Sequence, residues 1–237
     1  MDWTYEDIAG MIDHSLLTPA LTDDELRQGC ELAKEYAVVS VCIKPYAVKL
    51  AAEVLQGSNV AVGVTIGFPH GGHVTGVKVA EAKQTMDDGA VELDMVANIG
   101  KARSGDWDYV RDDIAAVVNA AHHGSAIVKV IFENCFLEDE HKIKLCEVCT
   151  EAGADFVKTS TGYGYYKTDA GYEYGGATDH DLTLMRKHSG PDVQVKAAGG
   201  VRTLDRLLEV RALGVTRVGA SATAAILDEA KKRLGVS

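Results

Sequence analysis

Two features are missing from this sequence, and each absence excludes a class of protein. No apolar run approaches the roughly 18 residues that a membrane-spanning helix requires, so we expect no insertion into a bilayer. No block of clustered Lys and Arg occurs either, and the formal net charge is −11. Because proteins bind nucleic acids by neutralising phosphates with such clusters, we expect no nucleic-acid partner, and an anionic ligand would need a local positive site.

Cysteine is scarce and odd in number, which argues against a framework of disulfides. The five cysteines occur without a secretory segment, so we expect reduced thiols in a cytoplasmic protein. Cys146 and Cys149 form a C-x-x-C pair inside the helical stretch 138–152. No second pair completes a zinc site and no strand leads into this one, so we interpret the two cysteines as inert helix residues.

Short β-branched runs alternate with longer amphipathic stretches along the chain, which predicts repeated strand-helix units. The predicted strands are residues 11–15, 38–43, 61–66, 91–96, 126–131, 155–159, 193–197 and 216–219. Eight units favour an α/β fold of the (β/α)8 TIM-barrel type. The rival fold, a doubly wound open sheet, lacks its G-x-G-x-x-G after the first strand.

No linker or low-complexity segment divides the chain, so we expect a single barrel domain over residues 1–237. One segment is irregular. Residues 163–176 are rich in Tyr and Gly and are too many for an ordinary loop between a strand and a helix. We therefore predict an inserted loop there.

Three ionisable residues, Asp94, Lys158 and Lys196, lie within the apolar strands. Catalytic groups of such barrels come from the carboxyl ends of the strands. A structural ion-pair cluster is one interpretation of these residues. Two lysines facing one carboxylate favour catalysis, because a neighbouring cation lowers the affinity of a lysine for its proton. A neutral lysine can then attack a carbonyl group.

Glycines follow the last two predicted strands, where barrels commonly bind phosphate. Gly199, Gly200 and Gly219 would let backbone N–H groups approach an anion, although tight turns would explain them as well. Arg202 would add positive charge or cap the following helix. Lys129, in the predicted strand 126–131, and Glu133 are predicted to form a supporting ion pair inside the barrel.

Several ordered segments resemble the deoxyribose-phosphate aldolase family, whose members are class I aldolases. The three signature segments are ELDMV (92–96), KTSTG (158–162) and KAAGGVR (196–202). Four further segments fall in the family's order: IDHSLLTP (12–19), VCIKP (41–45), IGFPHG (66–71) and RVGAS (217–221). The resemblance therefore spans essentially the whole chain, and it implies the same barrel.

The resemblance also implies roles for individual residues. Lys158 would form the Schiff base, Lys196 would lower the pKa of Lys158, and Asp94 would be the general acid/base. Further residues would form the substrate-binding site: Asp13, Ser15, Cys42, Thr161, Gly162, Gly199, Gly200, Arg202, Gly219 and Ser221. The implied reaction cleaves 2-deoxy-D-ribose 5-phosphate to D-glyceraldehyde 3-phosphate and acetaldehyde, without a metal or another cofactor. A homodimer or homotetramer is expected.

Three departures from the family pattern leave alternatives open. Tyr163 stands where some relatives carry a phosphate-binding lysine, Ala222 replaces the second serine of a pair, and the segment 165–174 is inserted. One alternative is a sibling Schiff-base aldolase or acyl-transfer enzyme with a different phosphorylated substrate. The other is a noncatalytic phosphosugar-binding barrel, which would gain nothing from a costly pair of lysines.

Overall fold

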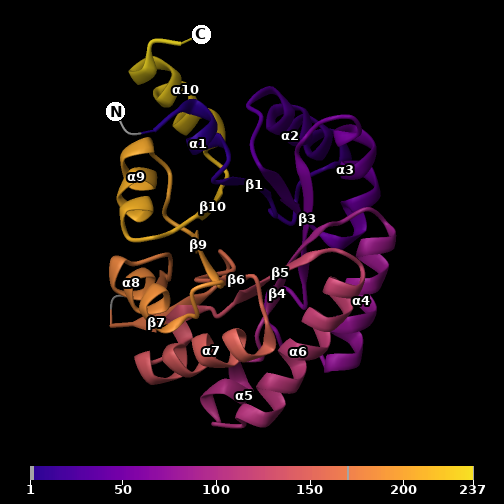
Figure 1. Ribbon diagram of the computed structural model, residues 1–237, viewed down its shortest axis with the longest axis vertical. Coiled ribbons are helices and arrows are strands. Elements are labelled where there is room, and N and C mark those ends of the chain that lie inside the picture. The colour runs from indigo at the N-terminus through magenta and orange to yellow at the C-terminus, as the bar shows by residue number, and fades with distance from the viewer. Residues whose placement is uncertain (1–2, 170, 237) are drawn as a thin grey trace.

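Eight parallel strands close into a barrel, with helices on its outside (Figure 1). The computed structural model describes residues 3–169 and 171–236. The barrel strands are β1 (Ile12–Leu16), β2 (Ser40–Ile43), β3 (Ala61–Ile66), β4 (Glu92–Val96), β5 (Ile127–Ile131), β6 (Phe156–Lys158), β9 (Gln194–Ala198) and β10 (Arg217–Ala220). They follow one another in this order, and β10 pairs with β1 to close the sheet. The (β/α)8 prediction is confirmed, and every predicted strand lies within two residues of the observed one.

Helices connect the strands and cover the barrel. They are α1 (Tyr5–Ala9), α2 (Asp23–Glu35), α3 (Val48–Leu55), α4 (Thr75–Asp87), α5 (Ile99–Arg103), α6 (Trp107–His123), α7 (Asp139–Ala152), α8 (Asp179–His188), α9 (Leu204–Ala212) and α10 (Thr223–Leu234). Local sequence fixes their ends: Thr22 caps α2 in a capping box with Glu25. Within the described residues, no helix has both the length and the apolar composition needed to span a membrane.

The segment between β6 and α8 is a β-hairpin rather than an irregular loop. Its strands β7 (Tyr165–Thr168) and β8 (Gly171–Tyr174) pair antiparallel and form a separate two-stranded sheet. The Tyr residues of both strands and Thr168 are of the types that favour strands. The sequence indicated the insertion, but its regular pairing was not predicted.

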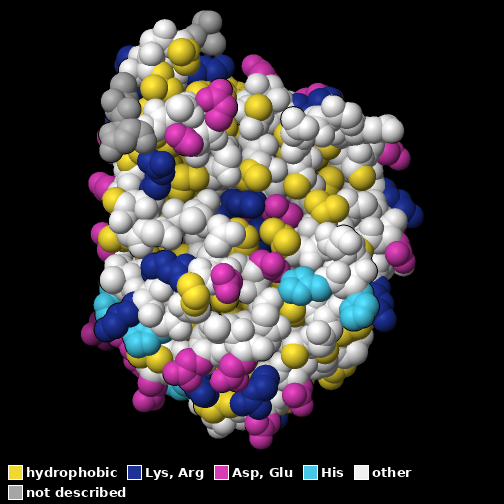
Figure 2. Space-filling model, viewed as in Figure 1, with side chains coloured by type: hydrophobic (Ala, Val, Ile, Leu, Met, Phe, Trp, Pro, Cys, Tyr) yellow, Lys and Arg dark blue, Asp and Glu magenta, His cyan; other side chains and the backbone are white. Residues whose placement is uncertain are grey.

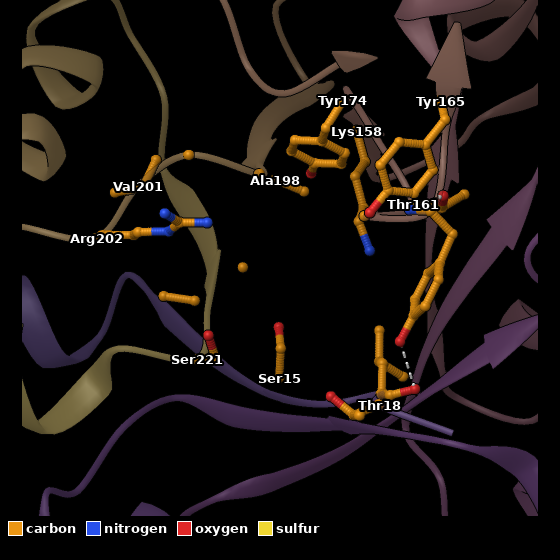
Figure 3. Close-up of a pocket in the computed structure, with 17 residues that line it drawn as sticks. Ser15, Thr18, Lys158, Thr161, Tyr165, Tyr174, Ala198, Val201, Arg202 and Ser221 are labelled. Atoms are coloured by element: carbon orange, nitrogen blue, oxygen red, sulfur yellow. Dashed lines mark hydrogen bonds between the residues drawn. The ribbon is translucent and has the colours of Figure 1, made fainter. Parts of the chain in front are cut away.

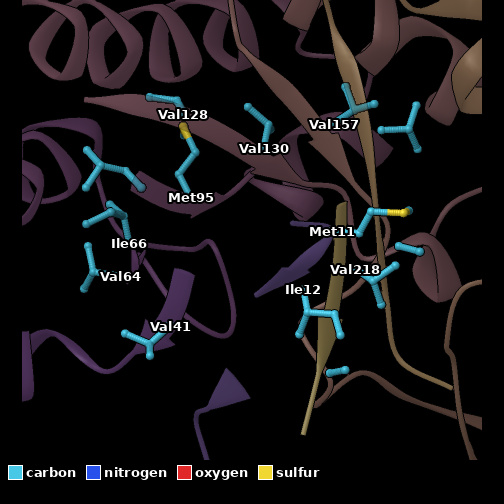
Figure 4. Packing of buried hydrophobic residues seen from close by; sticks show 14 of the residues in the cluster. Met11, Ile12, Val41, Val64, Ile66, Met95, Val128, Val130, Val157 and Val218 are labelled. Atoms are coloured by element: carbon cyan, nitrogen blue, oxygen red, sulfur yellow. The ribbon is translucent and has the colours of Figure 1, made fainter. Parts of the chain in front are cut away.

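The alternation of side chains along each strand separates an apolar layer from a polar one. Val64, Met95, Val130 and Val218 belong to the apolar cluster between the sheet and the helices (Figure 4). The residues between them on the strands point into the barrel, and many of these are charged or polar. Figure 2 shows acidic and basic side chains side by side at the centre of one face, over the barrel. The fold thus concentrates charge on the barrel axis.

Candidate active site

Strand register brings the two predicted lysines together. Lys158 of β6 pairs in register with Lys196 of β9, so the two side chains emerge side by side into the barrel. Asp94 of β4 faces them. Its Oδ2 atom accepts hydrogen bonds from Lys158 Nζ at 2.7 Å and from Lys196 Nζ at 2.6 Å. All three side chains are buried.

A second layer of charge surrounds this trio. Lys129 Nζ donates to the other oxygen of Asp94 at 2.9 Å and lies 3.1 Å from Asp13 Oδ2. Asp13 Oδ2 also contacts Lys196 Nζ at 2.5 Å, so Asp13 reaches the trio from beneath. Arg217 and Glu92 complete the layer: the guanidinium lies 2.6 Å from Asp13 Oδ1 and 2.9 Å from Glu92 Oε2.

The charged cluster holds one more cation than carboxylates when every member is ionised. Its members are Asp13, Glu92, Asp94, Lys129, Lys158, Lys196 and Arg217. Buried charge is costly unless it is balanced. Loss of one proton from one lysine makes the cluster neutral.

The distribution of carboxylates identifies which lysine loses that proton. Lys129 contacts three carboxylates, Lys196 contacts two and Lys158 contacts only Asp94. Burial lowers the pKa of Lys158, and the Lys196 ammonium lowers it further against the opposing effect of Asp94. Burial also disfavours the charged form of Lys196, but Asp13 and Asp94 raise its pKa above the ordinary value. Lys158 is therefore the member of the cluster best suited to be a neutral amine.

The carboxylates stay ionised. Burial favours the neutral form of Asp94, but Lys129, Lys158 and Lys196 together hold its pKa well below the ordinary value. Burial likewise opposes ionisation of Asp13, whose pKa is lowered by Lys129, Lys196 and Arg217. Asp94 is thus an acceptor at neutral pH, and the Lys196 ammonium, which donates to the same Asp94 oxygen as Lys158, is a proton donor beside it.

A cavity of about 360 Å³ opens above the charged cluster at the carboxyl ends of the strands. Figure 3 shows the Lys158 amine pointing into it, with Tyr165 and Tyr174 on one side and Ser15 and Ser221 on the other. The predicted residues that line it are Ser15, Lys158, Thr161, Gly162, Gly199, Gly200, Arg202, Gly219 and Ser221. Within the described residues, Lys158 is the only member of the charged cluster that lines this cavity.

Comparison with known proteins agrees with this geometry. The family model described as "DeoC/LacD family aldolase" matches residues 8–226 of the chain. A deoxyribose-phosphate aldolase of Rhodopirellula baltica is 57% identical over 99% of this chain and 94% of its own length. One from Thermococcus gammatolerans is 48% identical over 95% of this chain and 97% of its own length. The chain belongs to the DeoC/LacD family of aldolases.

Solved structures of aldolases share the fold of this family member. QR15, an aldolase, superposes with a TM-score of 0.88 at 35% identity, over 96% of this chain and 97% of its own. A tetrameric deoxyribose phosphate aldolase from Aeropyrum pernix gives 0.86 at 27% identity, over 97% of this chain and 93% of its own.

Other predicted residues of this aldolase lie in or beneath the cavity. The Cys42 thiol lies 3.7 Å from Asp94 Oδ2, and burial raises its pKa to about 11, so it is a neutral part of the wall at physiological pH. Gly162, Gly199 and Gly200 have φ values of 94°, 89° and 88°, which favour glycine. Arg202 lines the cavity rather than capping α9, since the cap is Thr203.

The predicted ion pair between Lys129 and Glu133 is wrong. Two residues four apart on a strand share a face, but β5 ends at Ile131 and Glu133 has a left-handed φ of +58°. The Glu133 carboxylate instead accepts hydrogen bonds from the backbone and the hydroxyl of Thr161, while Lys129 turns toward Asp13, Glu92 and Asp94. Glu133 thereby fixes the turn that carries Thr161 and Gly162.

Sequence reasoning assigned no role to Glu92 or Arg217. Glu92 lies two residues before Asp94, so the period of two along a strand signals that both face the barrel interior. Arg217 pairs in register with Lys196 and lies against the Phe156 ring, 5.3 Å from its centroid. Those contacts link residues far apart in sequence.

One group outside the cavity has the residue types of a metal site. Ligand atoms of Asp139, His180 and Asp181 lie within 4.8 Å of one another. The Lys142 ammonium already contacts Asp139 at 3.2 Å and Asp181 at 2.7 Å. The Lys142 ammonium thus supplies the positive charge that a metal ion would otherwise provide to these carboxylates.

Proposed function

We propose that this aldolase cleaves 2-deoxy-D-ribose 5-phosphate to D-glyceraldehyde 3-phosphate and acetaldehyde through a Schiff base on Lys158. The observation that carries the proposal is that the two lysines differ in their carboxylate contacts. Lys158 contacts Asp94 alone and faces the open cavity, whereas Lys196 contacts both Asp13 and Asp94. A buried amine with one counterion beside a second cation has the lone pair that attack on an aldehyde requires. The names and high identity of the relatives support the substrate.

In the first steps, Lys158 attacks C1 of the open-chain sugar and forms a carbinolamine. Loss of water, with a proton from the Lys196 ammonium, leaves an iminium ion. The proton of the C3 hydroxyl then passes through water to the Asp94 carboxylate, and the electrons of the C2–C3 bond move to the iminium nitrogen. Glyceraldehyde 3-phosphate leaves with C3 as its aldehyde carbon.

The second half of the reaction releases the two-carbon product. C2 of the enamine that remains on Lys158 takes up a proton, and water hydrolyses the resulting iminium to acetaldehyde. Positioned acids and bases of this kind typically contribute about 10²- to 10⁴-fold. Lys196 fits the donor role because Asp13 and Asp94 keep it charged. No step requires a metal, since the iminium ion accepts the electrons.

The phosphate would bind at the side of the cavity formed by the turns after β6, β9 and β10. Gly199 and Gly200 adopt conformations that bring backbone close to the cavity, and Arg202 supplies a cationic side chain. The Ser221 hydroxyl lines the same side. These groups offer the backbone donors and local positive charge that an anion requires in a protein of net negative charge.

The test is turnover of 2-deoxy-D-ribose 5-phosphate, followed by a coupled assay of the glyceraldehyde 3-phosphate released. The wild-type protein is expected to turn over, with activity unchanged after dialysis against EDTA. Lys158→Arg keeps the positive charge but cannot provide a neutral amine, so it should be inactive while retaining the wild-type melting temperature. Turnover by Lys158→Arg, or a requirement for added metal, would contradict the proposal.

We also propose a homodimer or homotetramer in the cytoplasm. Support for association comes from the tetrameric relative of Aeropyrum pernix. The five cysteines are free thiols, as a reducing compartment requires. Light scattering after size-exclusion chromatography distinguishes a monomer, which would contradict the proposal, from two or four copies.

A further inference from the structure

The β7–β8 hairpin carries two tyrosines into the cavity wall. Tyr165 and Tyr174 are directly paired across the two strands, with ring centroids 6.0 Å apart, and both line the cavity. Tyr166 belongs to the opposite face of the hairpin, where its hydroxyl contacts Glu173 at 3.5 Å. The hairpin therefore has a face that belongs to the active site.

The base of the hairpin is fixed to the barrel. Gly164 and Gly175 are joined by a backbone hydrogen bond of 3.2 Å, and both pack against Cys135 so closely that a β-carbon on either would overlap it. Just beyond, the Ala177 amide donates to the Gly199 carbonyl at 3.0 Å. Tyr174 lies next to this base and is held in place by it.

The Tyr174 hydroxyl lies over the turn that we assign to the phosphate. It packs on Gly199 so closely that a β-carbon there would overlap it, and a β-carbon on Gly162 would lie 4.0 Å from it. The hydroxyl therefore sits between the glycine turns that follow β6 and β9. In Figure 3, Tyr174 and Arg202 both project into the cavity.

This hydroxyl is a free donor. Within the described part of the chain it makes no hydrogen bond. Burial is the main cause that raises the pKa of Tyr174 to about 12, so the group keeps its proton at neutral pH. Three other hydroxyls of the cavity wall already donate inside the protein: Ser15 to the Asp13 carbonyl, Thr161 to Glu133 and Tyr163 to the Leu17 carbonyl.

We propose that Tyr174 is a specificity-determining residue whose hydroxyl donates a hydrogen bond to the phosphate group of the substrate. The inference rests on the proposed function and adds a residue from the inserted hairpin to it. The hydroxyl packs on the Gly199 turn and lines the same cavity as Arg202 and Ser221, and it has no competing acceptor among the described residues. A phosphate oxygen supplies the acceptor that the site leaves open.

The test compares Tyr174→Phe with Tyr172→Phe. Tyr172 lies on the same strand and the same face, but it is 75% exposed and lies outside the cavity wall, which makes it a matched control. A hydrogen bond to a charged group contributes enough for about a ten-fold or larger rise in KM on its loss. We expect this rise for 2-deoxy-D-ribose 5-phosphate with Tyr174→Phe, with kcat little changed. Cleavage of unphosphorylated 2-deoxy-D-ribose should be unaffected, and Tyr172→Phe should behave as wild type.

Calorimetric titration with inorganic phosphate tests the hydroxyl without catalysis. Tyr174→Phe should bind phosphate about ten-fold more weakly than wild type, even if the wild-type protein turns over a different sugar phosphate. Circular dichroism and melting temperature verify that the variant is folded, since only one oxygen atom is removed. Unchanged phosphate affinity would overturn the proposal. Equal loss of kcat with both sugars would also overturn it, because it would make Tyr174 part of the proton-transfer machinery.

Discussion

Replacing Lys196 by Met removes the cation beside the proposed nucleophile while keeping most of its volume. The two ammonium nitrogens contact the same Asp94 oxygen at 2.7 Å and 2.6 Å, so they lie within about 5 Å of each other. Two unit charges at ~5 Å repel by about 3 kcal/mol at an effective dielectric constant of about 20. Without that repulsion the pKa of Lys158 rises, and the neutral fraction of Lys158 at neutral pH falls by about 10²-fold.

The assay is the pH dependence of kcat/KM for the wild type and Lys196→Met. Activity requires neutral Lys158, so it rises as the pH increases through the pKa of this residue. Raising that pKa moves the acid limb of the profile to higher pH, and part of the lost activity returns in alkaline buffer. The part of the activity that does not return at high pH measures the loss of Lys196 as a proton donor. An acid limb at the wild-type position, with a loss equal at every pH, would refute the electrostatic role of Lys196.

Three further outcomes are expected. Asp94→Asn should slow turnover by at least about 10²-fold yet still permit reductive trapping of acetaldehyde, and normal turnover would remove Asp94 from the mechanism. Lys129→Met removes the one cation of the cluster that contacts all three carboxylates, so urea unfolding should show a loss of about 3–5 kcal/mol in the free energy of unfolding. The acid limb of the pH profile should shift less than in Lys196→Met, and an undiminished stability would contradict the importance of the second layer. Burial lowers the pKa of His14 from 6.5 to about 4, so protonation of the unfolded chain should reduce stability as the pH falls through this range, by up to roughly 3 kcal/mol. His14→Gln should lose less stability between neutral pH and a pH of about 4 than the wild type does, and equal losses would show that His14 does not titrate in this way.

The barrel could be predicted from the sequence because its signals are local. Most strands are short β-branched runs, and several of the helices that follow have a start signal of their own, such as the Thr22 capping box. Lys158, Lys196 and Asp94 could be found for a related reason. A charge inside an apolar strand stands out against its neighbours, and parallel strands bring their carboxyl ends together.

The remainder of the site depends on information that is not local. Asp13, Glu92 and Arg217 meet only because β1, β4 and β10 close around one axis, and their register is set by the whole sheet. The predicted pairing of Lys129 with Glu133 was wrong because β5 ends before Glu133, which adopts a left-handed conformation and turns away from the barrel interior. The hairpin depends on the pairing of two short strands and on the packing of Gly164 and Gly175 against Cys135. The Tyr-rich composition of the segment does not reveal either contact.

The central claim is that Lys158 forms the Schiff base, and reductive trapping tests it most directly. The protein is incubated with acetaldehyde and sodium borohydride, digested, and analysed by mass spectrometry to locate the ethylated residue. The account predicts one predominant adduct, on Lys158, because this lysine alone in the charged cluster combines a single carboxylate partner with access to the cavity. A predominant adduct on Lys196 or Lys129, or no adduct from a protein that is active in the same preparation, would contradict it.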